Sequence, residues 1–443
     1  NLSNRAAVGL FLEESNKSSF ISPQNFHFIS RDHQFPPVNN YFYDSSEMKV
    51  SAAALTVFST SLAYQGENLT QENQRKRLPW FRGQKPLALD VPSFIYTKTA
   101  KNARLIDAVK DLDYKPFPWV SSEPVVQMAI GLYVPSASDV KFHVEYVPLP
   151  DGGQLSLFWE EECYKKDDTK AILVISPGVT GGAEADYIRD LCKQAASKGY
   201  KPVVAHHRGV NCALTTPKMY HPGASEDFGS AVEYIHKKNP STPLVGIGIS
   251  MGGNIVLKYA GEHGTKSLLK AIAGISVPFN FRMCTERIQE MPYLNYLISY
   301  YVKKNIRENH LDFLRKFEEE LGLDLQLALS TNISLEMENA LSAKIYNVDD
   351  ILQFYDEGSC YRTVDKIAIP TYCLHTLDDP ICIKECIPYD KIKANPNIIM
   401  RNTMGGGHID FYSGTFIPRR WWPVPALAFL DEAVEMIKEG QFQ

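Results

Sequence analysis

Ser250 lies in a five-residue pattern that suits nucleophilic catalysis. Residues 248–252 read GISMG, which matches G-x-S-x-G, and they stand between an apolar run at 244–247 and a helix-capable stretch at 253–262. A sharp strand-to-helix turn strains the backbone at the serine, and the flanking glycines remove Cβ atoms that would collide there. The helix N-terminus adds positive charge where an oxyanion would develop. We therefore favour Ser250 as a nucleophile over a plain glycine-rich turn.

A serine hydroxyl is a weak nucleophile, so a histidine base should follow the last strand of the fold. His408 meets this requirement, because three glycines at 405–407 precede it and a short β-type run ends a few residues earlier. His206, His207 and His221 are the rivals. They precede the serine and adjoin the second buried strand, where structural roles are more usual. We predict that His408 is the base.

The histidine needs a carboxylate that orients its ring, and two candidates follow the preceding strand. Asp378 and Asp379 stand directly before Pro380. We favour Asp379, because the residue before the proline in such loops usually points back toward the nucleophile. Asp378 remains the alternative.

The loop after the first long buried strand can supply an oxyanion hole. It reads SPGVTGG at 176–182, and its backbone N–H groups can point at a substrate oxygen. We expect the pair of donors to be the amides of Val179 and Met251, the latter next to the nucleophile. For the Pro-Gly step at 177–178 alone, a simple turn is an equal alternative.

The elements that must position these residues form a regular alternation. Apolar runs buried on both faces are typical of parallel strands, and helical stretches between them indicate a doubly wound, mostly parallel α/β sheet. A hairpin signal, DGG at 151–153, separates two shorter β-type runs that come first. The expected strands are 144–150, 155–161, 171–176, 202–205, 244–248, 268–277, 370–377 and 398–401, and the expected helices between and after them include 183–198, 226–238 and 425–438.

Two regions interrupt this alternation. Residues 279–350 have helical character and separate two strands, which is where a helical cap over a ligand site is expected. Residues 1–105 show no sustained periodicity, and we interpret them as an irregular N-terminal extension to a domain at 106–443. The apolar stretch at 50–64 is shorter than the roughly 18–20 apolar residues that span a bilayer, so a buried or docking helix is the better interpretation.

Composition excludes some classes of function. The chain has 443 residues, 44% of them hydrophobic, and a net charge of −5, which offers no basic surface for nucleic acid. Its eight cysteines form no CxxC pair and no zinc-like spacing, so we expect no metal ion and no cofactor. Cysteines without a disulfide framework favour an intracellular, reducing compartment. The chain begins with Asn rather than Met, so we expect a processed or truncated N-terminus, which leaves targeting open.

A set of short motifs is spread along the chain: 177–181 (PGVTG), 207–209 (HRG), 220–223 (YHPG) with Glu226 and Asp227, 248–253 (GISMGG), 378–380 (DDP) and 406–408 (GGH). With these motifs, the sequence from about residue 114 to the C-terminus resembles the α/β-hydrolase branch of bacterial YheT-like hydrolases and eukaryotic α/β-hydrolase-domain lipases and phospholipases. The resemblance implies the α/β-hydrolase fold, a Ser250–Asp379–His408 triad in that chain order, and activity on acyl esters of glycerol or glycerophospholipid. Eukaryotic members often carry an N-terminal membrane anchor, and this chain departs there, because residues 1–105 contain no convincing span.

Three other possibilities concern acceptors and partners. The same branch includes enzymes that transfer acyl groups to small alcohols, so an acyltransferase is an alternative to a hydrolase. Peripheral contact with a membrane would suit a lipid ester substrate. The extension at 1–105, with its scattered aromatic residues, motivates a hypothesis from another class, in which the fold serves as a structural or scaffolding subunit of a larger assembly.

Overall fold

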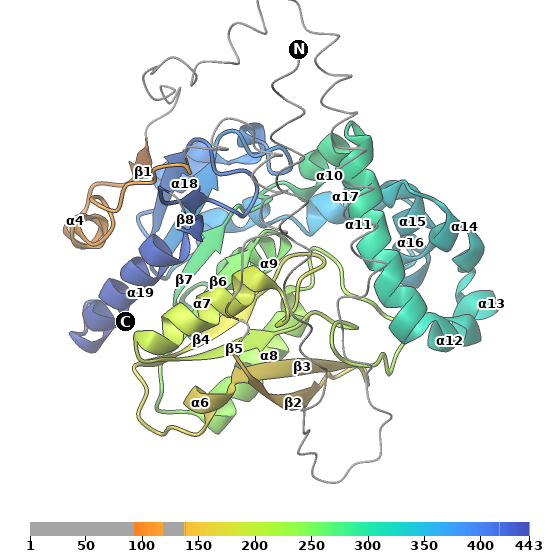
Figure 1. Ribbon diagram of the computed structural model, residues 1–443, viewed down its shortest axis with the longest axis horizontal. Coiled ribbons are helices and arrows are strands. Elements are labelled where there is room, and N and C mark those ends of the chain that lie inside the picture. Colours follow the sequence, from red (N-terminus) through yellow and green to blue (C-terminus); the bar gives the residue numbers. More distant parts are fainter. Residues whose placement is uncertain (1–92, 118–136, 138, 416, 443) are drawn as a thin grey trace, which may run out of the picture. The chain divides into compact units, whose positions relative to one another are not determined.

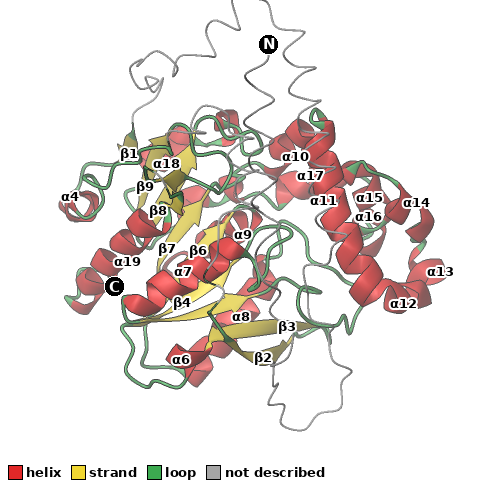
Figure 2. Ribbon diagram, viewed as in Figure 1, coloured by secondary structure: helices red, strands yellow, loops and turns green. Residues whose placement is uncertain are grey.

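A computed structural model describes residues 93–117, 137, 139–415 and 417–442, all within one compact unit at 40–443 (Figure 1). The predicted extension up to residue 92, with the apolar stretch at 50–64, lies outside the described residues. The described part is an α/β structure in which helices cover a twisted sheet (Figure 2). The sheet and one helical insertion position the candidate site.

The sheet has nine strands in the described chain, in the spatial order β1-β9-β8-β7-β6-β4-β5-β3-β2. Strands β4 to β9 are parallel, and β1, β2 and β3 pair antiparallel at the two edges. The central parallel strands consist of near-continuous apolar residues because both of their faces are buried. The bounds are β1 Phe94–Tyr96, β2 Phe142–Pro148, β3 Gln154–Glu160, β4 Ala171–Ser176, β5 Tyr200–Ala205, β6 Leu244–Ile249, β7 Leu269–Ile275, β8 Thr371–Thr376 and β9 Ile398–Thr403, with a separate pair β10 Tyr412–Ser413 and β11 Arg419–Arg420.

Helices pack on both faces of the sheet, and alternate residues of each strand face opposite layers. In β4, for example, Ile172 packs with α8 and α9 while Leu173 packs with α7 and α19. Figure 1 shows α7 and α19 together on one side of the sheet. The helices of these layers are α4 Ala100–Asp107, α6 Glu161–Tyr164, α7 Asp186–Ser197, α8 Ser225–Lys238, α9 Met251–His263, α18 Tyr389–Ala394 and α19 Pro423–Lys438.

The sheet begins earlier in the chain than the predicted boundary at residue 106. Strand β1 pairs with β9, and α4 follows it, capped by the Thr99 hydroxyl, which accepts the N–H of Asn102. Leu105 and Ile106 of α4 are buried in the same core as α19. Because a three-residue strand and a short helix have little periodicity of their own, the sequence pattern did not separate them from the extension.

Between β7 and β8 the chain forms a helical insertion, residues 281–357, which extends slightly beyond the predicted 279–350. Its helices lie together beside the sheet, in the teal and light blue part of Figure 1. Several of them share a hydrophobic cluster that includes Val302, Ile306 and Met337. The helices are α10 Phe281–Gln289, α11 Pro292–Asn305, α12 Leu311–Leu314, α13 Glu318–Leu321, α14 Leu325–Ser330, α15 Ser334–Ala340, α16 Ser342–Ile345 and α17 Ile351–Glu357.

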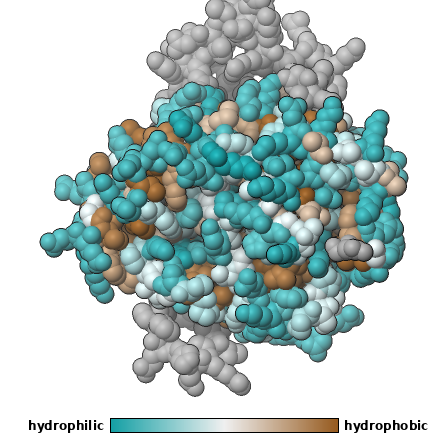
Figure 3. All heavy atoms as spheres, turned by 180° about the vertical axis from the view of Figure 1, so that it is seen from behind, coloured by the Kyte–Doolittle hydropathy of each residue, from teal (hydrophilic) through white to brown (hydrophobic). Residues whose placement is uncertain are grey.

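Surface hydrophobic residues are few in the described part of the chain. The face opposite to that of Figure 1 is mainly hydrophilic, with hydrophobic residues in separate small groups (Figure 3). Tyr301, Leu327 and Ile333, each more than two-fifths exposed, all lie on the helical insertion. None of the described helices has the length and hydropathy needed to span a membrane.

One close contact joins α9 to the end of β4. A Cβ atom on Gly252, in the first turn of α9, would lie 2.1 Å from the carbonyl oxygen of Ser176 and 2.4 Å from that of Pro177. Both obstacles are backbone atoms, so relief would require the loop after β4 or the start of α9 to move. The glycine therefore sets how closely these two segments approach.

We expect Gly252→Ala to destabilise the protein by at least about 1–3 kcal/mol, the usual cost of overpacking a core. The matched control is Gly229→Ala in α8, whose new Cβ would lie 3.4 Å from the Tyr259 ring. This control should change stability by no more than about 1 kcal/mol, because alanine is the better helix former. Denaturant unfolding of both variants tests the contact. Equal stabilities would contradict it.

Candidate active site

Ser250 occupies a strained turn between β6 and α9. Its backbone angles are φ 53° and ψ −122°, and a positive φ is rare for a residue with a side chain. The Ser250 N–H donates to the Ile275 carbonyl at 2.9 Å, which holds the turn against β7. A Cβ on Gly248 would lie 2.3 Å from the Gly252 carbonyl oxygen, so a glycine is required there. The turn matches the geometry predicted for the GISMG segment.

His408 reaches Ser250 from the loop after β9. Its Nε2 lies 2.8 Å from the Ser250 hydroxyl oxygen, although 158 residues separate the two in the chain. Gly405 and Gly407 have positive φ values of 81° and 63°, which explains why glycines precede the histidine. The Ser276 hydroxyl donates to the His408 carbonyl and so anchors this loop against the end of β7.

Asp379, rather than Asp378, contacts the histidine. The Nδ1 atom of His408 lies 2.9 Å from Asp379 Oδ2, while Asp379 Oδ1 accepts the N–H groups of Ile381 and Cys382, each at 2.8 Å. The neighbouring Asp378 accepts the Thr376 hydroxyl and, at 2.8 Å, the Gly405 N–H. Asp378 therefore bonds to the loop that carries the histidine, and Asp379 is the carboxylate that contacts the His408 ring.

The electrostatics of the site favour a protonated imidazole. Burial by itself lowers the pKa of His408, but the charge of Asp379, their hydrogen bond and the charge of Asp410 outweigh it, so the pKa is raised above the ordinary 6.5. An imidazolium that forms when the serine gives up its proton is thus stabilised where it forms. This is the environment that a general base needs.

Asp410 was not singled out from the sequence. It follows His408 by two residues and is buried, and burial raises the pKa of its carboxyl to about 6 against the opposing charges of Arg420 and His408. The charge of Asp410 raises the pKa of His408 through space, without a hydrogen bond between the two side chains. Its position two residues after the predicted base was the sequence signal that could have indicated Asp410.

The two amides expected for the oxyanion hole belong to segments that flank Ser250. Met251 is the first residue of α9, so its N–H has no acceptor within the helix. The loop that contains Val179 packs against the nucleophile, since a Cβ on Gly178 would lie 3.6 Å from the Ser250 Cβ. The role of both amides remains a prediction.

The three rival histidines have structural contacts. His206 Nε2 accepts the Ala183 N–H at 2.9 Å, and His207 Nε2 bonds the Pro177 carbonyl at 2.9 Å. The His221 ring packs against aromatic rings of the helical insertion. Burial lowers the pKa of His206 and His221 to about 3 and that of His207 to about 4. These rings are therefore neutral near pH 7.

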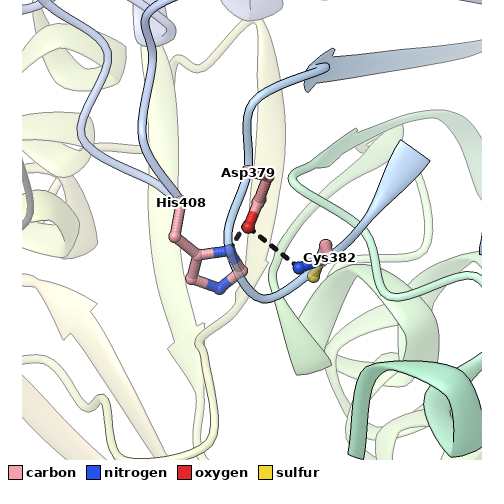
Figure 4. A group of neighbouring side chains, drawn as sticks. All are labelled: Asp379, Cys382 and His408. Atoms are coloured by element: carbon pink, nitrogen blue, oxygen red, sulfur yellow. Dashed lines mark hydrogen bonds and ion pairs between the residues drawn. The ribbon is translucent and has the colours of Figure 1, made fainter. Parts of the chain in front are cut away.

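Among the described residues, the side chains of Asp379, Cys382 and His408 have the spacing of a metal site, with ligand atoms within 4.8 Å of one another. Figure 4 shows Asp379 between the His408 ring and the backbone nitrogen of Cys382. A metal ion would have to break the Asp379–His408 hydrogen bond and bind a thiolate, whereas burial raises the pKa of Cys382 to about 12. The donor set fits a triad better than a metal.

Comparison with known proteins agrees with this geometry. A family model described as alpha/beta hydrolase fold matches residues 171–415. Phospholipase ABHD3 of Mus musculus is 31% identical over 313 residues, which cover 69% of this chain and 75% of that protein. Monoacylglycerol lipase ABHD2 of Homo sapiens is 27% identical and covers 66% and 71%, and monoacylglycerol lipase of Saccharomyces cerevisiae is 27% identical and covers 60% of each. These matches confirm the predicted fold class and resemblance.

Asp379→Asn should lower kcat by roughly 10⁴-fold, because an amide cannot hold the imidazole in the required tautomer and charge state. Asp378→Asn is the matched control, since an amide oxygen can still accept from Thr376 and Gly405, and it should retain at least about a tenth of the activity. Ester hydrolysis rates of the two variants decide between the carboxylates. Equal losses would contradict the assignment.

The acid limb of the pH profile should have its midpoint above pH 6.5. His408 acts as a base only when neutral, and its raised pKa means that activity falls as the pH decreases through that higher value. In Asp410→Asn the limb should move to lower pH, because one charge that raises this pKa is lost. Asp365→Asn, a change at a site bonded to Lys391, should leave the limb in place. The profile of kcat/KM measures both effects, and an unmoved limb in Asp410→Asn contradicts the role of Asp410.

Proposed function

The chain belongs to the alpha/beta hydrolase fold family, and on this premise we propose that it hydrolyses acyl esters with Ser250 as nucleophile, His408 as base and Asp379 as the orienting acid. The observation that carries the proposal is the continuous pair of hydrogen bonds from Asp379 through His408 to Ser250, at 2.9 and 2.8 Å, at a strained strand-to-helix turn. His408 and Asp379 are both buried, which strengthens these two hydrogen bonds.

The proposed reaction proceeds through an acyl-enzyme. His408 Nε2 takes the proton of the Ser250 hydroxyl as its oxygen attacks the ester carbonyl, and the amides of Val179 and Met251 bind the resulting oxyanion. The protonated His408 then gives its proton to the leaving alcohol. In the second half, His408 deprotonates a water molecule that attacks the acyl carbon, and it then returns this proton to the Ser250 oxygen as the bond to the acyl group breaks and the acid is released. Asp379 holds the ring throughout.

For the substrate we propose an acyl ester of glycerol or glycerophospholipid. The support comes from the relatives, which are named as a phospholipase and monoacylglycerol lipases. The helical insertion at 281–357 joins the carboxyl end of β7 to β8, and ligands of open α/β sheets bind at that edge.

Labelling with a fluorophosphonate probe tests the nucleophile. The wild-type protein should be labelled covalently, and Ser250→Ala should lose the label and at least about 10⁴-fold of its ester hydrolysis, since triad serines contribute on this scale. Ser197→Ala removes an exposed hydroxyl at the end of α7 and serves as the control with unchanged labelling. Full activity in Ser250→Ala would overturn the proposal.

A panel of monoacylglycerols, diacylglycerophospholipids and lysophospholipids then tests the substrate class, with free acid measured as the product. Added short-chain alcohol separates hydrolysis from acyl transfer, because an acyltransferase would form the alkyl ester instead of the free acid. Labelling without turnover of any lipid ester would support the nucleophile and contradict the proposed substrate class.

A further inference from the structure

The loop that contains Val179 is held at several points of its backbone. His207 bonds the Pro177 carbonyl at 2.9 Å, and the Gly178 N–H donates to the Tyr187 hydroxyl at 3.0 Å, so the peptide between residues 177 and 178 is held at both ends. The Tyr220 hydroxyl donates to the Val179 carbonyl at 2.6 Å. The peptide that joins Gly178 to Val179 lies between these two held peptide groups, which therefore restrict its rotation.

That middle peptide carries the Val179 N–H expected in the oxyanion hole. Its carbonyl, on Gly178, accepts the Gly181 N–H at 3.1 Å. Because a peptide group is planar and trans, the Val179 N–H points away from this bonded carbonyl. The direction of the N–H thus depends on Gly181 on one side and on the bond from Tyr220 to the next carbonyl on the other.

Tyr220 belongs to a segment, residues 207–221, that connects this loop to the helical insertion. At its start, His207 contacts the loop, and its ring lies 5.5 Å from the Tyr220 ring. Farther along, Leu214 and Met219 are buried in the hydrophobic cluster of the insertion. The residue next to Tyr220 is thus anchored in the core of the insertion.

Hydrogen bonds also connect the segment 207–221 to the helical insertion. The Tyr346 hydroxyl of the insertion donates to the Met219 carbonyl, directly before Tyr220. The Gly209 carbonyl accepts from Asn305 Nδ2 at 3.0 Å, and His310 Nε2 bonds it at 2.6 Å. Figure 1 shows the insertion as a group of helices beside the sheet, so these contacts link two separate layers of packing. Movement of the insertion would therefore pull on the segment 207–221 through these anchors.

We propose that Tyr220 is a positioning residue for the oxyanion hole, and that the segment 207–221 couples the orientation of the Val179 amide to the placement of the helical insertion. This inference rests on the proposed function, in which Val179 binds the oxyanion. Substrate that displaces the insertion changes the oxyanion hole through Tyr220. The effect falls on kcat rather than on KM, because the oxyanion exists only during the reaction.

Tyr220→Phe removes the hydroxyl and keeps the ring. We expect kcat per fluorophosphonate-labelled site to fall about 10- to 100-fold, less than the 10²–10³ for loss of an oxyanion donor itself, with KM within about threefold. The inhibition constant of a trifluoromethyl ketone, whose adduct with the serine places an oxyanion in the hole, should rise by a similar factor. The melting temperature should change little.

Tyr234→Phe is the matched control, because it removes a half-buried hydroxyl of α8 that contacts Lys238. An unchanged kcat in Tyr220→Phe would overturn the inference, as would a loss explained by fewer labelled sites or by a lower melting temperature. Failure of the proposed function is distinguishable, since it would appear as retained hydrolysis in Ser250→Ala.

The coupling to the insertion is tested with Tyr346→Phe in a double-mutant cycle. We expect Tyr346→Phe to lower kcat several-fold, and the double variant to lie within about threefold of Tyr220→Phe alone, because both hydroxyls act on the same segment. The coupling would be overturned if the losses in kcat multiplied in the double variant, or if Tyr346→Phe lost none. The role of Tyr220 itself is decided by Tyr220→Phe alone.

Discussion

The close approach of α9 to the end of β4 is the constraint on which the site depends. At Gly252 the backbone of the Ser176–Pro177 step comes so near that a Cβ would lie 2.1 Å from a carbonyl oxygen. This contact brings the loop that follows β4 next to the first turn of α9, beside Ser250. The turn requires a strained backbone at Ser250, which has a positive φ, and the packing of α9 against β6 and β7 maintains this conformation.

Burial decides which ionisable groups can act in catalysis. Asp379 is buried, yet both of its oxygens are satisfied, one by two backbone N–H groups and the other by His408. A buried carboxylate bonded in this way keeps a single orientation, and its charge raises the pKa of the histidine beside it. His206 and His207 bond backbone groups, and burial lowers their pKa values.

The motifs outside the triad acquire a physical role in the fold. Arg208 forms ion pairs with Asp151 at 2.8 Å and Asp227 at 2.6 Å, and its own side chain is almost fully buried. It therefore ties the hairpin of β2 and β3 to the start of α8 at the root of the segment 207–221. At the other end of the segment, the Tyr220 hydroxyl donates to the Val179 carbonyl, while Leu214 and Met219 pack with the insertion.

The sequence alone determined the elements whose causes are local. The GISMG turn, the glycines before His408 and the buried apolar runs are short-range patterns, and the structure has a strand-to-helix turn, positive φ values and parallel strands at those places. The choice between Asp378 and Asp379 was open, because the two neighbours differ only in what lies across space from them. Strand β1 and Asp410 escaped the sequence patterns, and Tyr220 appeared there only as part of the shared YHPG motif. Only the tertiary structure shows what surrounds each of them. Each has its main partner far along the chain or acts through space, and local spacing carries no information about such contacts.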